Sequence, residues 1–296
     1  MDKRIEPGRY SVLMTVYSGT QLVELRESLG SMAEQSVPPS EYVIVADGPL
    51  SDEVAYELET YDGLIAGIRL KLIKLGENRG AGYASKVGVE HCAFPLIARM
   101  DSDDISLPSR LEKQLRMMEE HPEYAAIGCW AREFITGEGI VSTVELPVEP
   151  DDLEKYARRR CPVRHPCLLI NKEMLQKAGG YSDIRFAEEW DIVNKLIQAG
   201  YQCANIPEPL VMVRVGKDFY ARRGGAENAK RILRFKWNML KRRQMGLLDY
   251  LISASASVVV CFVPNSCRAF IYERLLRKPD SHAEGEHGSV ENGRCS

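Results

Sequence analysis

Three carboxylates, Asp101, Asp103 and Asp104, follow directly after the short apolar segment 95–98. In an open α/β sheet, ligands bind outside the carboxyl ends of the strands, where a hard divalent cation takes oxygen ligands and leaves positions free for substrate phosphates. An Asp-x-Asp after a strand can therefore hold a metal ion against a diphosphate. The alternative is a helix N-cap, because residues 104–109 precede an apolar repeat of helical spacing. This run alone leaves both interpretations open.

Other polar residues are expected at the same edge of the sheet. They are Thr15, Val16 and Tyr17 after the first strand, Asp47 after the second, Asn78, Arg79 and Gly80 before the helix that precedes the fourth, and Asp101, Ser102 and Asp103 after the fourth. In a doubly wound sheet all of them face one crevice. Asp47 beside a turn suits a hydrogen bond to a nucleobase or ribose, whereas Asp101 and Asp103 suit ribose and metal.

The first half of the chain alternates between strand-like and helix-like segments, which predicts the elements that position these residues. This alternation is typical of a mostly parallel sheet covered on both faces. The expected strands are 10–16, 42–46, 70–75 and 95–100, and the expected helices lie around 22–32, 52–60 and 80–92.

The second half is less regular and favours antiparallel pairing. Segments 125–134 and 140–144, separated by Gly-Glu-Gly, predict a hairpin. A loop and a short strand over 165–170 are followed by Asn171, which can cap a helix that ends near Lys177. The remaining expectations are a helix over 187–199 and two strands, 202–206 and 210–215.

The charge is distributed unevenly, since residues 217–278 hold 14 Lys and Arg against 4 acidic residues while the whole chain has a net charge of −3. A basic helix here precedes the apolar segment 247–263, which is too short to be a confident membrane span. The pattern favours a helical pair on an anionic membrane surface, and the alternative is a helical cap whose basic face is merely solvated. Few aromatic residues accompany the charges, which argues against nucleic acid as a partner.

Composition limits the remaining classes. With 296 residues and 45% hydrophobic content, the chain can bury one large core or a core with an appendage. Its eight cysteines have no Cys-x-x-Cys spacing and no signal segment opens the chain, so we expect a cytoplasmic location. Cys161, His165 and Cys167 match no usual zinc spacing. We expect a catalytic domain over 1–216, a membrane-associating segment over 217–278 and a disordered tail over 279–296.

The order of these motifs resembles family 2 glycosyltransferases of the GT-A fold. The resemblance covers about residues 10 to 215 and is weaker for a bacterial exopolysaccharide (amylovoran-type) subgroup. The residues that carry it are Val12 to Tyr17, the segment Val45-Ala-Asp-Gly-Pro-Leu50, Asn78-Arg-Gly80, the Asp-x-Asp at 101 and 103, Gly179-Gly-Tyr181 and Ala187-Glu-Glu-Trp-Asp191.

The resemblance implies an inverting, metal-dependent transfer from a nucleoside-diphosphate sugar, such as a UDP-sugar, to a saccharide or lipid-linked acceptor. Asp47 would contact uracil, Asp101 the ribose or sugar, and Asp103 the Mg²⁺ or Mn²⁺ that neutralises the leaving diphosphate. The family typically shows Glu-Asp at the start of a helix where this chain has Glu188-Glu189.

This departure leaves the identity of the base open. Glu189 occupies the position of the base, and Asp191 is the second choice. Glu188 is expected to contact the acceptor substrate or to support another residue of the site. The alternative is that acids in a first helical turn simply complement the helix dipole.

Several further positions are less specific. His165 would contact donor or acceptor, or serve only the structure, and Arg222 and Arg223 could contact diphosphate or form basic surface. The resemblance implies a further polar contact to the metal after the last strand. The segment Val213-Arg-Val-Gly216 has no His there, which leaves this third metal contact in doubt. Other functions remain open: a sugar-phosphate nucleotidyltransferase, although the loop after the first strand lacks a cation, or a non-catalytic nucleotide-sugar-binding membrane module.

Overall fold

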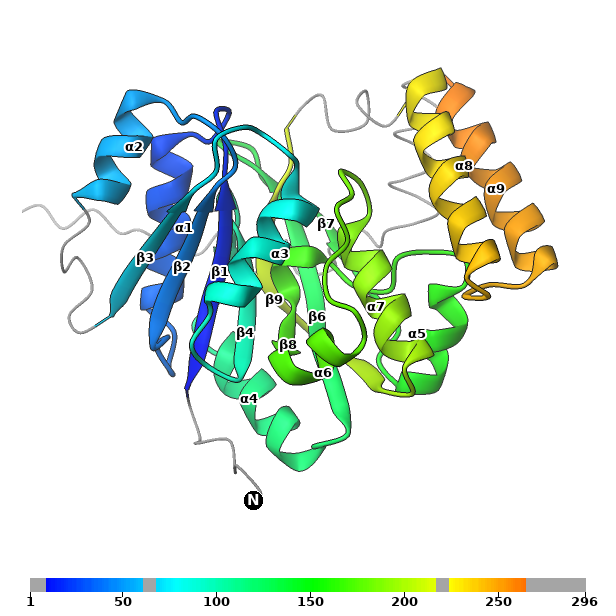
Figure 1. The fold of residues 1–296 in the computed structure, drawn as a ribbon, viewed down its shortest axis with the longest axis horizontal. Helices are drawn as coiled ribbons and strands as arrows, with labels where there is room; N and C mark the ends of the chain where they lie inside the picture. The colour runs from blue at the N-terminus through cyan, green and yellow to red at the C-terminus, as the bar shows by residue number, and fades with distance from the viewer. Residues whose placement is uncertain (1–8, 61–67, 217–223, 265–296) are drawn as a thin grey trace, which may run out of the picture.

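A single nine-stranded sheet organises the molecule (Figure 1). The computed structural model describes residues 9–60, 68–216 and 224–264. The strand order is β3-β2-β1-β4-β8-β6-β9-β5, with β7 paired to β6. The strands are β1 (Tyr10–Val16), β2 (Glu41–Ala46), β3 (Arg69–Lys74), β4 (Leu96–Asp101), β5 (Ile105–Ser106), β6 (Tyr124–Ile135), β7 (Gly139–Val144), β8 (Leu169–Asn171) and β9 (Gln202–Arg214).

Strands β1 to β4 form the parallel half that the sequence predicts, because every neighbouring pair among them runs parallel. Their side chains alternate between two cores. Val12 and Met14 of β1 belong to one cluster, whereas Leu13 belongs to the other. Such alternation is expected of a strand buried on both faces.

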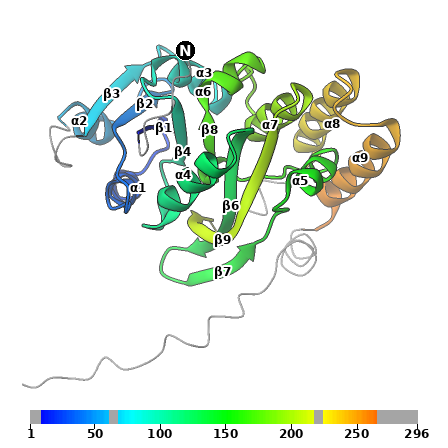
Figure 2. The same cartoon turned by 90° about the horizontal axis from the view of Figure 1, so that it is seen from below.

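Helices cover both faces of this sheet (Figure 2). One face buries apolar side chains of α1 (Leu22–Ala33), α2 (Asp52–Glu59) and α4 (Arg110–Glu120). The other buries those of α3 (Ala81–His91), α5 (Pro150–Ala157), α6 (Lys172–Lys177) and α7 (Glu188–Gln198). The doubly covered mixed sheet confirms the expected fold class.

The second half partly corrects the sequence prediction. The β6–β7 hairpin is antiparallel as expected, and Asn171 caps α6 by accepting from the Met174 N–H. The two strands expected at 202–206 and 210–215 are instead one long strand, β9, which pairs parallel to β6 with register shifts around Pro209. Proline lacks an N–H and so usually marks the end of a strand in a sequence. Here the pairing of β9 with β6 continues on both sides of Pro209.

Two elements were not expected from the sequence. Helix α5 spans eight residues and buries only Leu153 and Ala157, so its apolar repeat is too brief to recognise. Strand β5 has two residues and exists only through its pairing with β9.

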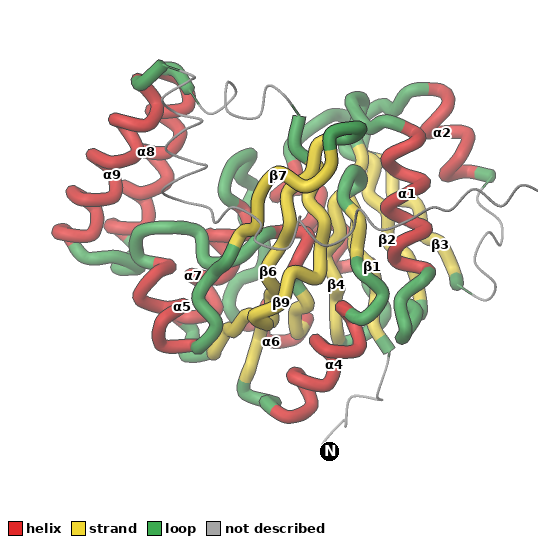
Figure 3. The backbone as a smooth tube through the Cα atoms, turned by 180° about the vertical axis from the view of Figure 1, so that it is seen from behind, coloured by secondary structure: helices red, strands yellow, loops and turns green. Residues whose placement is uncertain are grey.

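The carboxyl-terminal part of the described chain is a pair of helices, α8 (Ala226–Lys241) and α9 (Leu247–Phe262), as the basic and apolar patterns predict. The pair packs beside α7, and α9 lies at the outer edge of the molecule (Figure 3). Among the described residues, no helix combines the length and apolar character needed to cross a bilayer. Arg222, Arg223 and the expected tail at 279–296 lie outside the described residues.

Candidate active site

Strand β4 ends in the carboxylate run. Asp101 is its last residue and lies in parallel register with Thr15 of β1, while its carbonyl accepts the Ser28 hydroxyl of α1 at 2.8 Å. Arg99 lies two residues earlier on the same face of β4 and is fully buried. Its guanidinium donates to Asp101 Oδ1 at 3.0 Å and to the Leu13 carbonyl at 2.6 Å. The β1 and β4 ends are therefore tied together beneath the Asp101 carboxylate.

His165 joins this edge to the start of α7. Its Nδ1 is 4.0 Å from Asp101 Oδ1 and 3.8 Å from Glu188 Oε1. Its Nε2 accepts from Arg99 Nε at 3.1 Å and lies 2.9 Å from the Tyr181 hydroxyl. An arginine can only donate, so Nε2 carries no proton and Nδ1–H faces the two carboxylates. Burial, followed by the charge of Arg99, holds the pKa of His165 well below its usual value.

Two glutamates open α7 at this point. Ala187 precedes them with a positive φ of 59°, which turns the chain sharply into the helix. Burial, together with the charge of Glu189, raises the pKa of Glu188 to about 8. Burial also raises the pKa of Glu189, while a backbone hydrogen bond at Glu189, the charge of Arg164 and the Cys161 thiol oppose that rise. At neutral pH, Glu188 is therefore mostly protonated.

Asp103 and Asp104 have different surroundings. Burial and the charge of Asp101 raise the pKa of Asp103 to about 6. Asp104 is buried, and its Oδ1 accepts the backbone N–H of Arg214 at 2.8 Å. Helix α4 begins later, at Arg110, and its N-cap Ser109 makes no side-chain cap. The expectation that Asp104 caps a helix is therefore wrong, since its carboxylate joins the loop to the end of β9.

Asp47 holds the loop that precedes α3. Its two carboxylate oxygens accept the backbone N–H groups of Arg79 at 2.7 Å and Gly80 at 2.8 Å. A Cβ on Gly80, whose φ is +96°, would meet Arg185 Cγ at 2.6 Å, which explains the glycine. Only 4% of Asp47 is exposed, so a contact with uracil stays a prediction, whereas its contacts with this loop are direct.

The same loop contacts the segment that leads into α7. The Arg185 guanidinium donates to the Asn78 carbonyl at 2.5 Å, and Arg79 pairs with Asp183 and stacks 3.5 Å above the Tyr83 ring. The predicted donor loop and the entry to α7 are thus neighbours. The Arg79 side chain is engaged within the protein, and its predicted contact with the donor is not tested by this structure.

Asp191, the second candidate for the base, is buried in a structural network. Its Oδ2 accepts from Ser182 at 2.6 Å and forms an ion pair with Lys195 at 2.9 Å, and its Oδ1 accepts from Arg242 at 2.8 Å. These contacts fix α7 to the preceding loop and to the end of α8. The structure therefore favours a supporting role for Asp191.

The donor set at the β4 end suits a hard cation. Within residues 9–60, 68–216 and 224–264, no group of three or more His, Cys, Asp or Glu side chains is arranged to hold a metal ion by itself. Mg²⁺ and Mn²⁺ sites commonly use one or two carboxylates and complete their shell with substrate phosphates and water. Burial raises the pKa of both Asp101 and Asp103, and a bound cation would relieve this unfavourable charge.

Some residues of this site were named from the sequence and others were not. Ser102 is buried beside Asp101, whereas Tyr17 is half-exposed at the end of β1. Sequence reasoning gave no role to Arg99, Arg164, Tyr181 or Arg214. The two-residue spacing of Arg99 and Asp101 within one strand could have indicated the first of these, because residues i and i+2 share a face.

Comparisons with known proteins identify the family of this chain. Residues 11–177 match the family described as Glycosyl transferase family 2. The chain is 30% identical to the amylovoran biosynthesis glycosyltransferase AmsE of Erwinia amylovora, over 90% of this chain and 98% of that protein. It is 27% identical to the Escherichia coli UDP-Gal:alpha-D-GlcNAc-diphosphoundecaprenol beta-1,3-galactosyltransferase, over 91% and 97% of the two chains.

Solved structures share the fold at lower identity. The mannosyltransferase PcManGT of Pyrobaculum calidifontis in complex with GDP-Man and Mn²⁺ superposes with a TM-score of 0.59 at 18% identity, over 90% of this chain and 81% of that one. S. aureus TarS 1-349 in complex with UDP-GlcNAc gives 0.56 at 18% identity, over 76% and 66%. The family match and the relatives together establish that this chain is a glycosyltransferase and belongs to glycosyl transferase family 2.

Proposed function

We propose that the protein is an inverting, metal-dependent enzyme that moves a sugar from a UDP-sugar to a saccharide or lipid-linked acceptor during cell-surface polysaccharide synthesis. One observation carries the proposal: Asp101 at the end of β4 and Glu188 at the start of α7 both lie near one imidazole nitrogen, at 4.0 and 3.8 Å from His165 Nδ1. Donor-side and acceptor-side carboxylates therefore meet in one site. The names of the two relatives support the substrate classes.

Glu189 is the base in this proposal. The acceptor hydroxyl oxygen forms a bond to the anomeric carbon as the bond from that carbon to the diphosphate oxygen breaks. The hydroxyl proton passes to the Glu189 carboxylate, and the electron pair of the broken bond leaves with the nucleoside diphosphate. The positive charge of Arg164 favours the ionised form of Glu189 that this step needs. Glu188, with a pKa of about 8, donates a hydrogen bond to the acceptor instead.

Asp101 and Asp103 would hold the Mg²⁺ or Mn²⁺, with Asp101 also within reach of the donor ribose or sugar. When bound, the cation supplies charge neutralisation to the departing diphosphate. Arg99 and His165 orient the Asp101 carboxylate from below, because both lie buried against it and Arg99 is tied to β1. Asp47 shapes the loop of Asn78, Arg79 and Gly80 beside the donor.

The α8–α9 pair would hold the enzyme at the cytoplasmic face of a membrane, where a lipid-linked acceptor resides. Seven large apolar side chains of the pair are exposed: Trp237, Leu247, Leu248, Leu251, Ile252, Val259 and Phe262. Basic residues of α8 flank them, which is the combination that anionic bilayer surfaces attract.

The assignment of the base is tested by the rate of sugar transfer. We expect Glu189→Gln to lower kcat by about 10²- to 10⁴-fold. The matched variant Glu188→Gln keeps most of the activity, because the glutamine amide can still donate a hydrogen bond to the acceptor. Wild-type turnover in Glu189→Gln, or loss of turnover only in Asp191→Asn, would contradict Glu189 as the base.

A further inference from the structure

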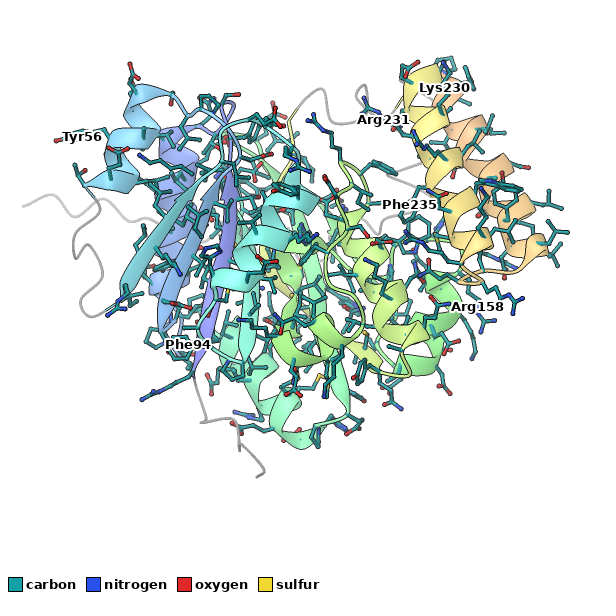
Figure 4. The ribbon with its side chains drawn as sticks, viewed as in Figure 1. Tyr56, Phe94, Arg158, Lys230, Arg231 and Phe235 are labelled. Carbon is teal, nitrogen blue, oxygen red and sulfur yellow. The ribbon has the colours of Figure 1, made fainter. Side chains whose placement is uncertain are left out.

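Two adjoining hollows lie far along the surface from the carboxylates, where α5 meets the turn between α8 and α9. The first measures about 430 Å³ and the second about 650 Å³. They share Arg158 and Asp249, so they form one continuous depression that we call the arginine hollow. Figure 4 shows Arg158 beside the end of the helical pair where α8 gives way to α9.

The cations of the arginine hollow outnumber its acids. Three of them are paired, as Lys155 with Asp152 at 3.2 Å, Arg158 with Glu154 at 2.8 Å and Arg159 with Asp249 at 2.6 Å. Among the described residues, Arg160 and Arg243 have no ion-pair partner. Two guanidinium groups are therefore free to bind an anion, and their planar forks suit the oxygens of a phosphate.

Arg243 occupies a backbone position that favours glycine. Helix α8 closes with the Arg243 N–H donating to the Leu240 carbonyl at 3.0 Å and the Gln244 N–H donating to the Met239 carbonyl at 2.9 Å. In this type of helix ending, the residue with positive φ is most often glycine. Arg243 has φ of +59° and, within the described backbone, shares a positive φ with only one other non-glycine residue, Ala187 at the active site. An arginine held in this unfavourable backbone conformation indicates a functional role for its charged side chain.

An apolar stripe begins at the same turn. Leu247, Leu248, Leu251 and Ile252 are 45% to 67% exposed, and Val259 and Phe262 continue the stripe along α9. Their spacing places them on one face of the helix, directed away from α8. The arginine hollow thus adjoins the first turn of an apolar face that the described residues leave exposed.

From this juxtaposition we infer that the arginine hollow binds the phosphate headgroups of anionic phospholipids while the α9 stripe enters the adjoining acyl region. The inference rests on the membrane contact in the proposed function and names the site that makes it. Charge and apolar surface side by side fit a bilayer, because a soluble phosphate would use the arginines alone and leave the stripe unexplained. Arg160 and Arg243 are the contacts to the headgroups.

The decisive variant is Arg243→Gly, because glycine suits the backbone at this position and the variant retains the fold. We expect it to bind vesicles of equal parts phosphatidylglycerol and phosphatidylcholine about fivefold more weakly than the wild type. Its Tm should be unchanged or raised. Arg160→Gln should weaken binding similarly, and Arg116→Gln, an exposed arginine on α4, should leave it unchanged.

The remaining arms distinguish a lipid site from a site for free phosphate or RNA. The wild type should bind pure phosphatidylcholine vesicles more weakly than the anionic vesicles. Leu251→Ser should bind the anionic vesicles more weakly than the wild type does. Millimolar inorganic phosphate should not displace the wild type from the anionic vesicles. Equal vesicle binding by Arg243→Gly and wild type, or displacement by free phosphate, would overturn the inference. RNA binding with the same loss in Arg243→Gly would also overturn it.

Catalysis is followed independently in the same proteins. Arg243→Gly should transfer sugar to a detergent-dispersed acceptor at the wild-type rate, and Glu189→Gln should bind vesicles like the wild type. Failure of the transfer assay therefore counts against the proposed reaction, whereas failure of the vesicle assay counts against the lipid site.

Discussion

At the scale of single residues, the acids near the active site differ in what they contact. Asp191 accepts hydrogen bonds from Ser182 and Arg242 and forms an ion pair with Lys195, whereas Glu188 and Glu189 lie near other carboxylates. A buried carboxylate that is fully paired stabilises a fold, and one that faces like charge opposes it. The same helical turn therefore contains one acid fixed by its partners and, in the proposed function, two acids that act on the acceptor.

This contrast predicts opposite effects on stability. Asp191→Asn should lower the free energy of unfolding by about 2–3 kcal/mol, less than for a fully buried pair because Arg242 is half-exposed. Glu189→Gln should leave it unchanged or raise it, since one buried like charge is removed. Urea unfolding at neutral pH measures both. Equal destabilisation by the two variants would show that Glu189 is also a structural contact.

Arg164 should set the pH dependence of the base. Its cation lowers the pKa of Glu189, which burial raises, and Glu189 must be ionised to accept a proton. In Arg164→Gln the pKa of Glu189 therefore rises, and the acid limb of kcat/KM moves to higher pH. Arg164→Lys keeps the charge and should keep the limb in place. The side chain is anchored by a 2.6 Å ion pair with the buried Glu133.

At the scale of elements, the α8–α9 pair contains a buried cation that lies against α7. Lys236 of α8 donates to the Ser253 carbonyl at 2.7 Å and the Ser257 hydroxyl at 2.8 Å of α9, and it lies 5.7 Å from the Trp190 ring of α7. Burial, with the charge of Arg160, lowers the pKa of Lys236 from 10.5 to about 8.

Stability should therefore rise with pH through this group. Below pH 8, Lys236 is protonated in both states and its burial opposes folding in full. From pH 8 to 10.5, the unfolded chain binds a proton that the folded chain does not, so the free energy of unfolding increases. Lys236→Met should be more stable than wild type at neutral pH, and its advantage should shrink towards pH 10.5. The exposed Lys230→Met is the control, and a pH-independent difference would contradict the assignment.

Elements with a strong local signal could be predicted from the sequence. The run Tyr10–Val16 forms β1 with those bounds, and α3, α7 and α9 lie within a residue or two of expectation. Strand β5 and the parallel pairing of β6 with β9 could not be predicted, because both depend on residues about 80 to 110 positions apart. Local pattern carries no information about such partners.

At the scale of the whole molecule, the fold brings distant segments to one edge of the sheet. The ends of β1, β2 and β4 were expected there because parallel strands share an edge. The hydrogen bonds that join Arg99, His165 and Tyr181 were not predicted from the sequence. These residues come from three separate segments: β4, the loop before β8 and the loop before α7. Side-chain networks of this kind depend on packing, which motif spacing does not describe.

The central claim is that this edge binds a nucleotide sugar with a divalent cation, and ligand-dependent thermal stability tests it most directly. With Mn²⁺ and a UDP-sugar at about 100 times its Kd, the protein should gain about 2.7 kcal/mol, or about 5–10 °C in Tm. Asp103→Asn should lose the metal-dependent part of this shift. If no UDP-, GDP- or dTDP-sugar raises the Tm in the presence of Mn²⁺, or if Asp103→Asn shifts as the wild type does, the account is contradicted.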